Sequence, residues 1–218
     1  MSLIRLKTEI LHTDIRPSLI KEMQEKEAAG TLNAETDIIP YYFYLATKNK
    51  TLSLENQGLQ TDAMIFESAF RSKAKNKDRR KQEEAHNLNY AHKCAYLLIQ
   101  KGYMPYASHI KYTGPLDDSD SHHRTIGIVM GKLEEVAIPE VTIFPECGVS
   151  FGIVAGCMLH TYLNKEIGVS ALNPKVWLPE DSVLTFDEGY DFINENIFSK
   201  RIEFIHKIDE IIGLKTII

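Results

Sequence analysis

Side chains that could take part in chemistry are concentrated in residues 108–122. His109 is followed by three carboxylates, Asp117, Asp118 and Asp120. Carboxylates at this density could bind a metal ion, cap the next helix or hold the hydroxyls of a sugar. The spacing lacks the glycine and the distal glutamate of a calcium loop, so we expect no metal here. Helix capping, for which Asp120 is well placed, and ribose recognition both stay open.

A second group of candidate residues follows the apolar run of residues 63–66. Ser68, Phe70 and Arg71 come directly after it, and a basic stretch then extends over residues 71–81. Because charge runs usually lie in water, one interpretation is a solvated loop that leads into a helix. The other is a patch that steers an anionic small molecule.

The hydrophobic pattern predicts how these residues are positioned. Short apolar runs of strand type alternate with stretches of helical periodicity. Strands are expected at residues 63–66, 103–107, 141–144 and 167–170, and helices at residues 81–101, around 126–133 and at 149–164. Pro105 indicates that the second strand lies at an edge or ends irregularly. This alternation predicts a three-layer α/β/α domain with a mainly parallel sheet, Rossmann-like or flavodoxin-like.

Ligands of parallel sheets bind beyond the carboxyl ends of the strands. This rule selects the loops of residues 67–80, 108–122 and 145–150. We expect a pocket there that is lined by Ser68, Phe70, Arg71, His109, Asp117 and Gly148.

The N-terminal residues 1–60 are interpreted as an appendage packed on the α/β domain of residues 61–218. Residues 17–29 have a helical pattern, and Gly30 is a natural stop. The aromatic residues 37–45 are expected to form a buried irregular or strand segment.

The C-terminal residues 192–214 carry isoleucines at helical spacing. This pattern predicts a helix that packs on the core or forms a dimer interface. We expect a homo-oligomer, for which this apolar face is a candidate contact.

Composition excludes several classes of protein. The chain has 218 residues and a net charge of −5, so binding to a nucleic acid polymer is not expected. Cys94, Cys147 and Cys157 are spaced neither as a zinc site nor as an even disulfide framework, which favours a reducing, cytoplasmic compartment. We find neither a signal peptide nor an apolar stretch long enough to cross a bilayer, and expect no membrane partner.

Several segments together carry a resemblance to a known family. They are residues 64–71, 102–109, 116–120 with Arg124, Gly127 and Gly131, and 140–144. In this order and spacing, residues 62–172 resemble the nucleoside 2-deoxyribosyltransferase-like superfamily, most closely its uncharacterised branch common in phage and bacterial genomes. The resemblance implies a pocket for a nucleoside, nucleotide or related N-riboside, no cofactor, and hydrolase or transferase activity at the N-glycosidic bond.

The resemblance also shows a departure in the loop that should carry the catalytic group. In the family a glutamate attacks C1′ of the sugar or stabilises its positive charge. The family pattern is roughly Ser-x-Gly-Val/Met-x-x-Glu-Leu/Ile. In this chain Gly148 and Val149 match the pattern. Gly152 stands in place of the glutamate, and Glu146 stands in place of the serine. Either Glu146 supplies a substitute carboxylate, or the chain is a non-catalytic sensor or sequestering protein that kept the pocket. An acid at position 146 would also repel a 5′-phosphate at contact distance.

The resemblance thus assigns two sets of residues. Candidate catalytic residues are Glu146, Asp117 and Asp118. Candidate substrate-binding residues are Ser68, Phe70, Arg71, His109, Tyr112, Arg124, Gly148, Val149, Ser150 and Gly152.

Overall fold

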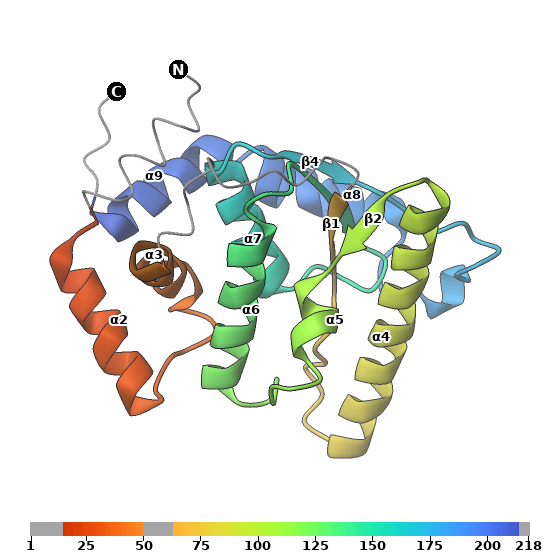
Figure 1. The fold of residues 1–218 in the computed structure, drawn as a ribbon. Coiled ribbons are helices and arrows are strands. Elements are labelled where there is room, and N and C mark those ends of the chain that lie inside the picture. The colour runs from red at the N-terminus through yellow and green to blue at the C-terminus, as the bar shows by residue number, and fades with distance from the viewer. Residues whose placement is uncertain (1–14, 50–62, 214–218) are drawn as a thin grey trace.

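The computed structural model describes residues 15–49 and 63–213, and its centre is a four-stranded parallel sheet (Figure 1). The strands are β1 (Ala63–Ser68), β2 (Met104–Tyr106), β3 (Glu140–Phe144) and β4 (Glu166–Val169), and their order is β2-β1-β3-β4. All three strand pairs are parallel, with Met64 opposite both Pro105 and Glu140. The predicted parallel sheet is confirmed, and β2 is an edge strand, one of the two positions that Pro105 indicated.

Helices on both faces complete a three-layer α/β/α fold, as the sequence predicts. Alternate residues of β1 point to opposite faces, so Ile65 joins one buried cluster and Phe66 another. Helix α4 (Lys77–Gln100) covers the face of Phe66, whereas α6 (Ser121–Glu135) and α7 (Phe151–Tyr162) cover the face of Ile65.

Two N-terminal helices extend the larger core, which corrects one expectation. Helix α2 (Pro17–Ala29) ends at Gly30, whose φ of 64° is the left-handed cap that the sequence indicates. Residues 37–45 were expected as an irregular or strand segment but lie largely in helix α3 (Ile38–Asn49). Pro40 is tolerated because it lies in the first turn, where backbone N–H groups have no partner within the helix. Burial of the aromatic side chains against α6, α7 and α9 then favours the helix over the β-propensity of its residues.

The C-terminal segment forms α8 (Phe186–Ile193), a π-helical turn (Asn194–Phe198) and α9 (Arg201–Ile212). Ile193, Ile197, Ile208 and Ile212 are fully buried in the larger core. Most of the apolar stripe therefore packs within its own chain, whereas Ile202 is exposed. Homo-oligomer formation stays a prediction, but it loses most of the surface that motivated it.

Two short helical elements complete the described chain, namely α5 (Ser108–Tyr112), in a segment expected to be a loop, and a 3-10 turn (Pro179–Asp181). Helix α5 packs closely on α6, where a Cβ on Gly131 would lie only 2.1 Å from Cβ of Ser108. None of the described helices combines the length and apolar character that a bilayer span requires.

Candidate functional site

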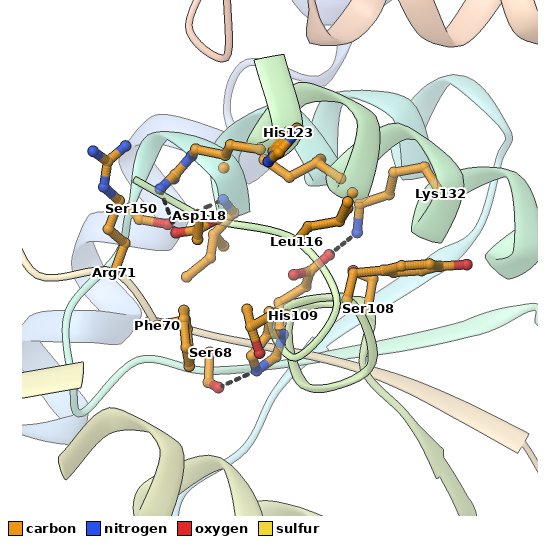
Figure 2. A pocket seen from close by; sticks show the side chains of 18 residues that line it. Ser68, Phe70, Arg71, Ser108, His109, Leu116, Asp118, His123, Lys132 and Ser150 are labelled. Carbon is orange, nitrogen blue, oxygen red and sulfur yellow. Dashed lines mark hydrogen bonds and ion pairs between the residues drawn. The ribbon is translucent and has the colours of Figure 1, made fainter. Parts of the chain in front are cut away.

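A pocket of about 650 Å³, including space continuous with solvent, opens at the carboxyl end of β1 (Figure 2). Its walls come from β1 and the loop after it, from α5 and α6, and from the N-terminus of α7. In the sheet β2 lies on one side of β1, and β3, which follows β2 in the sequence, lies on the other side of β1. The pocket therefore lies at the topological switch point, where parallel sheets of this order bind ligands.

Most of the residues that the sequence assigned to the site meet in this pocket. They are Ser68, Phe70, Arg71, His109, Tyr112, Asp118, Arg124, Ser150 and Gly152. Residues from three separate segments of the chain, 68–71, 109–124 and 150–152, therefore share one cavity. Four other assigned residues, Glu146, Asp117, Gly148 and Val149, do not line it.

Glu146 points away from the pocket into the smaller core. Its carboxylate accepts hydrogen bonds from the Tyr90 hydroxyl and, at 2.7 Å, from the backbone N–H of Leu172. The turn that precedes α7 explains this direction: the N–H of Gly148 donates to the carbonyl of Pro145 at 2.7 Å, and Gly148 adopts a φ of 92° that favours glycine. Glu146 is therefore not positioned to act on a ligand in this pocket, and its charge gives no contact repulsion against a phosphate there.

The other assigned residues outside the pocket have structural contacts. Asp117 accepts hydrogen bonds from the backbone N–H and the hydroxyl of Ser119, at 2.9 and 2.6 Å, and so shapes the loop. Val149 packs against the larger core. Asp120 caps α6 by accepting from the N–H of His123 at 2.9 Å, which confirms its predicted capping role.

One wall of the pocket holds a partly buried ion pair. Arg124 Nη1 lies 3.1 Å from Asp118 Oδ2, and Arg71 lies close enough to influence both groups electrostatically. Burial raises the pKa of the Asp118 carboxyl above its usual range, although both arginines act against this. The wall thus offers a carboxylate for sugar hydroxyls and guanidinium groups for an anion.

A second polar pair links β1 to α5. Ser68 Oγ lies 2.9 Å from Nε2 of His109 (Figure 2). The His109 ring packs edge-on against Phe66. Burial lowers the pKa of His109 to about 4, so the imidazole is neutral at physiological pH. The pair can exchange a hydrogen bond with a ligand but brings no charge.

A buried charged cluster borders the pocket, and the sequence analysis did not identify it. The Lys132 ammonium forms ion pairs with Glu67 and, at 2.8 Å, with Glu135, and lies 3.4 Å from Nε2 of His160. Only Glu67 and Lys132 of this cluster also line the pocket. The ligand atoms of Glu67, Glu135 and His160 lie within 4.8 Å of one another, a spacing that could suit a metal ion. Lys132 contacts all three, so the protein itself supplies a positive charge at their centre.

Two sequence signals could have revealed this cluster. Helix α7 contains no Asp, Glu, Lys or Arg, and His160 is its single histidine, which indicates a buried polar partner. Glu67 ends the apolar run of β1, at the carboxyl end where parallel sheets place ligands. Lys132 and Glu135 gave a weaker signal, because a lysine and a glutamate three residues apart are common on exposed helical faces.

The N-terminus of α7 closes the remaining side of the pocket. Ser150 caps this helix by accepting from the N–H of Ile153 at 3.4 Å. A Cβ on Gly152 would meet Ser150 Oγ, Arg124 Nη2 and Ile128 Cδ1 at 3.7 to 3.9 Å, which is ordinary contact. The position where the family glutamate is expected therefore faces the pocket and has room for a side chain. The helix N-terminus also favours an anion at this end.

Comparison with protein families gives one match over the central part of the chain. Residues 65–169, just under half of the chain, match the family described as a domain of unknown function, DUF7768. Comparison with curated proteins and with solved structures finds no significant match. The matched residues include the whole pocket lining, from Glu67 to Ile153.

Proposed function

We propose that the pocket binds a nucleoside, a nucleotide or a related N-riboside. The observation that carries this proposal is that segments distant in the sequence line the same pocket. Three of the four segments that resemble the nucleoside 2-deoxyribosyltransferase-like superfamily lie far apart in the sequence, yet they supply walls of one pocket at the switch point of the sheet. Gly152, which stands where the family carries its glutamate, is one of these lining residues.

The chemistry of the walls suits the parts of such a ligand. Asp118 can accept hydrogen bonds from sugar hydroxyls. Phe70, Tyr112 and Ile128 offer aromatic and apolar surface to a base. Arg124, together with the N-terminus of α7, can neutralise a phosphate.

A phosphorylated ligand is part of this proposal. The sequence suggested that Glu146 would repel a 5′-phosphate, but its carboxylate bonds Tyr90 and Leu172 outside the pocket. Arg71 and Arg124 line the pocket near Asp118 and can contact a phosphate. We therefore expect nucleoside monophosphates to bind at least as well as nucleosides.

Isothermal titration calorimetry with nucleosides, their 5′-monophosphates and ribose 5-phosphate tests this proposal. Arg124→Gln should weaken binding of the phosphorylated ligands most, and Asp118→Asn should weaken binding of every ligand that contains the sugar. Arg79→Gln is the matched control, because Arg79 pairs with Glu83 on the exposed surface of α4. Absence of binding across the panel by the wild-type protein would contradict the proposal.

Whether the ligand is also cleaved depends on which carboxylate faces it. Gly152 has no side chain and Glu146 is directed elsewhere, which favours binding without chemistry, as in a sensor or a sequestering protein. The presence of Glu67 in the lining favours cleavage of the N-glycosidic bond. Comparison of base release with binding, for the same ligand, separates these two candidates.

We also propose that the protein functions in a reducing compartment such as the cytoplasm. Cys94, Cys147 and Cys157 are all unpaired and buried. Free thiols of this kind fit an environment in which disulfides do not persist. Mass measurement after alkylation of freshly isolated protein, with and without prior reduction, checks this.

A further inference from the structure

We propose that Glu67 is the carboxylate that acts on C1′ of the bound N-riboside and so takes the role of the glutamate replaced by Gly152. This inference rests on the proposed function, because it names the reacting group of the same pocket. Glu67 lies within residues 64–71, one of the resembling segments, but the resemblance assigns it no role; it stands on β1 and not on the loop before α7, where the family carries its glutamate.

Glu67 combines a fixed carboxylate with a free oxygen atom. It is the penultimate residue of the strand β1, lines the pocket and keeps 8% of its side chain exposed. Lys132 and His160 both approach it through Oε1 (the Lys132 contact is drawn in Figure 2). Within the described part of the chain no hydrogen bond reaches Oε2. One oxygen is therefore anchored while the other is available to a ligand.

The cluster places a positive charge beside this carboxylate. Burial alone would lower the pKa of Lys132, but Glu135 and Glu67 outweigh it and raise that pKa above its ordinary value. His160 stays neutral, because burial and the neighbouring Lys132 lower its pKa well below the usual range. A protonated lysine beside Glu67 thus stabilises the negative form, which is the form that can attack a carbon or stabilise positive charge.

The glycines of α7 make room for this arrangement. A Cβ on Gly156 would lie 2.9 Å from Glu67 Oε1 and 3.0 Å from Lys132 Cε, so a side chain there would disturb the ion pair. One turn earlier, Gly152 leaves open the part of the pocket where another carboxylate would stand. Helix α7 therefore accommodates a carboxylate that comes from β1 and presents none of its own to the ligand.

The proposed reaction is hydrolysis in two steps. In the first, Oε2 of Glu67 forms a bond to C1′, the C1′–N bond breaks, and its electron pair leaves with the base nitrogen, which takes a proton from solvent. In the second, water attacks C1′, the ester bond to Glu67 breaks, the carboxylate is restored, and the proton of the water returns to solvent. The net change is N-riboside plus water to free sugar plus base, with no oxidation or reduction.

Three proteins test the inference: wild type, Glu67→Gln and the matched control Glu146→Gln. Glu146 is also a buried carboxylate close to the carboxyl end of the sheet, but it lies outside the pocket. Base release is followed by chromatography, ligand binding by calorimetry and folding by thermal unfolding. We expect Glu67→Gln to lower base release by about 10³-fold or more while it still binds the nucleoside, and Glu146→Gln to release base at the wild-type rate.

A trapping experiment does not depend on how the variant folds. A nucleoside with fluorine at C2′ destabilises positive charge at C1′ and slows hydrolysis of the ester. Incubation with the wild-type protein should add one sugar mass to the chain, and tandem mass spectrometry should locate it on Glu67. Location on Asp118 or any other residue would overturn the inference.

The outcomes separate the two proposals. Binding without base release by wild type supports the proposed binding function and overturns the role of Glu67. Equal base release by wild type and Glu67→Gln also overturns it. If no N-riboside binds, the proposed function fails and the inference falls with it.

Discussion

Substitution of Gly152 tests whether the pocket has the shape described. The residue is the second of helix α7, directly after the Ser150 cap and Phe151. Because a Cβ there would make only ordinary contacts at 3.7 to 3.9 Å, Gly152→Ala should fit without displacing its neighbours. Replacing a helical glycine with alanine should then raise the free energy of unfolding by about 0.5–1 kcal/mol.

Gly152→Glu should be more stabilising than Gly152→Ala. A carboxylate in the first turn interacts favourably with the helix N-terminus, which adds about 0.3–1 kcal/mol. Arg124 Nη2, 3.8 Å from the Cβ position, provides a nearby positive charge. The sum is about 1–2 kcal/mol relative to wild type, which for a domain of this size raises Tm by about 2–8 °C.

Urea unfolding of wild type, Gly152→Ala, Gly152→Gln and Gly152→Glu measures these effects separately. The difference between Gly152→Glu and Gly152→Gln isolates the charge and should shrink in high salt, because salt screens the interaction. A clear loss of stability in Gly152→Ala would refute the reasoning, since it would show that the position is filled and does not face an open pocket. If the pocket holds an N-riboside, base release by G152E should also exceed that of wild type.

Three further predictions concern the walls of the pocket. Lys132→Met should lower the free energy of unfolding in urea by about 3–5 kcal/mol, because it leaves two buried carboxylates without their cation. Gly131→Ala should destabilise the fold by about 1–3 kcal/mol and weaken nucleoside binding in calorimetry, since the added Cβ would lie 2.1 Å from Cβ of Ser108 and push α5 away. His109 has a folded pKa of about 4, below its value of about 6.5 in the unfolded chain, so its contribution to stability is complete above pH 6.5 and is lost as the pH falls toward 4. The loss should be about 1–3 kcal/mol and should be absent in His109→Gln, as measured by urea unfolding at a series of pH values.

Each of these predictions has a matched comparison. Lys101→Met changes an exposed lysine, and equal stability of the two lysine variants would show that the buried cluster contributes little. Gly114→Ala adds a Cβ with no heavy atom within 4 Å, so it should leave stability and binding nearly unchanged. For His109, parallel pH profiles of wild type and His109→Gln would contradict the assignment of the acid-linked loss to this residue.

The sheet could be predicted from the sequence because its signals are local. Apolar runs that alternate with helical periodicity define the strands, and Pro105 suggested the edge position of β2. Helix α3 was not predicted, because its conformation depends on contacts with distant parts of the chain and not on local signals. Tyr41, Tyr42 and Phe43 favour strands by propensity, and only their burial against distant helices selects the helix.

The site was predictable at the level of loops but not of side-chain directions. The rule that ligands bind beyond the carboxyl ends of strands led to Ser68, Arg71 and His109. Spacing could not show that a tight turn before α7 directs Glu146 toward Tyr90. Nor could it show that charged residues on β1, α6 and α7 would meet in one buried cluster, since such pairing depends on packing between elements distant in sequence.

A crystal structure with a bound ligand tests the central claim most directly. The ligand should be the N-riboside that binds most tightly in calorimetry, soaked at a concentration that saturates the protein in solution. The account predicts density at the carboxyl end of β1, with the sugar hydroxyls against Asp118 and C1′ facing Glu67. An empty pocket under these conditions, or the ligand bound on another face of the protein, would contradict it.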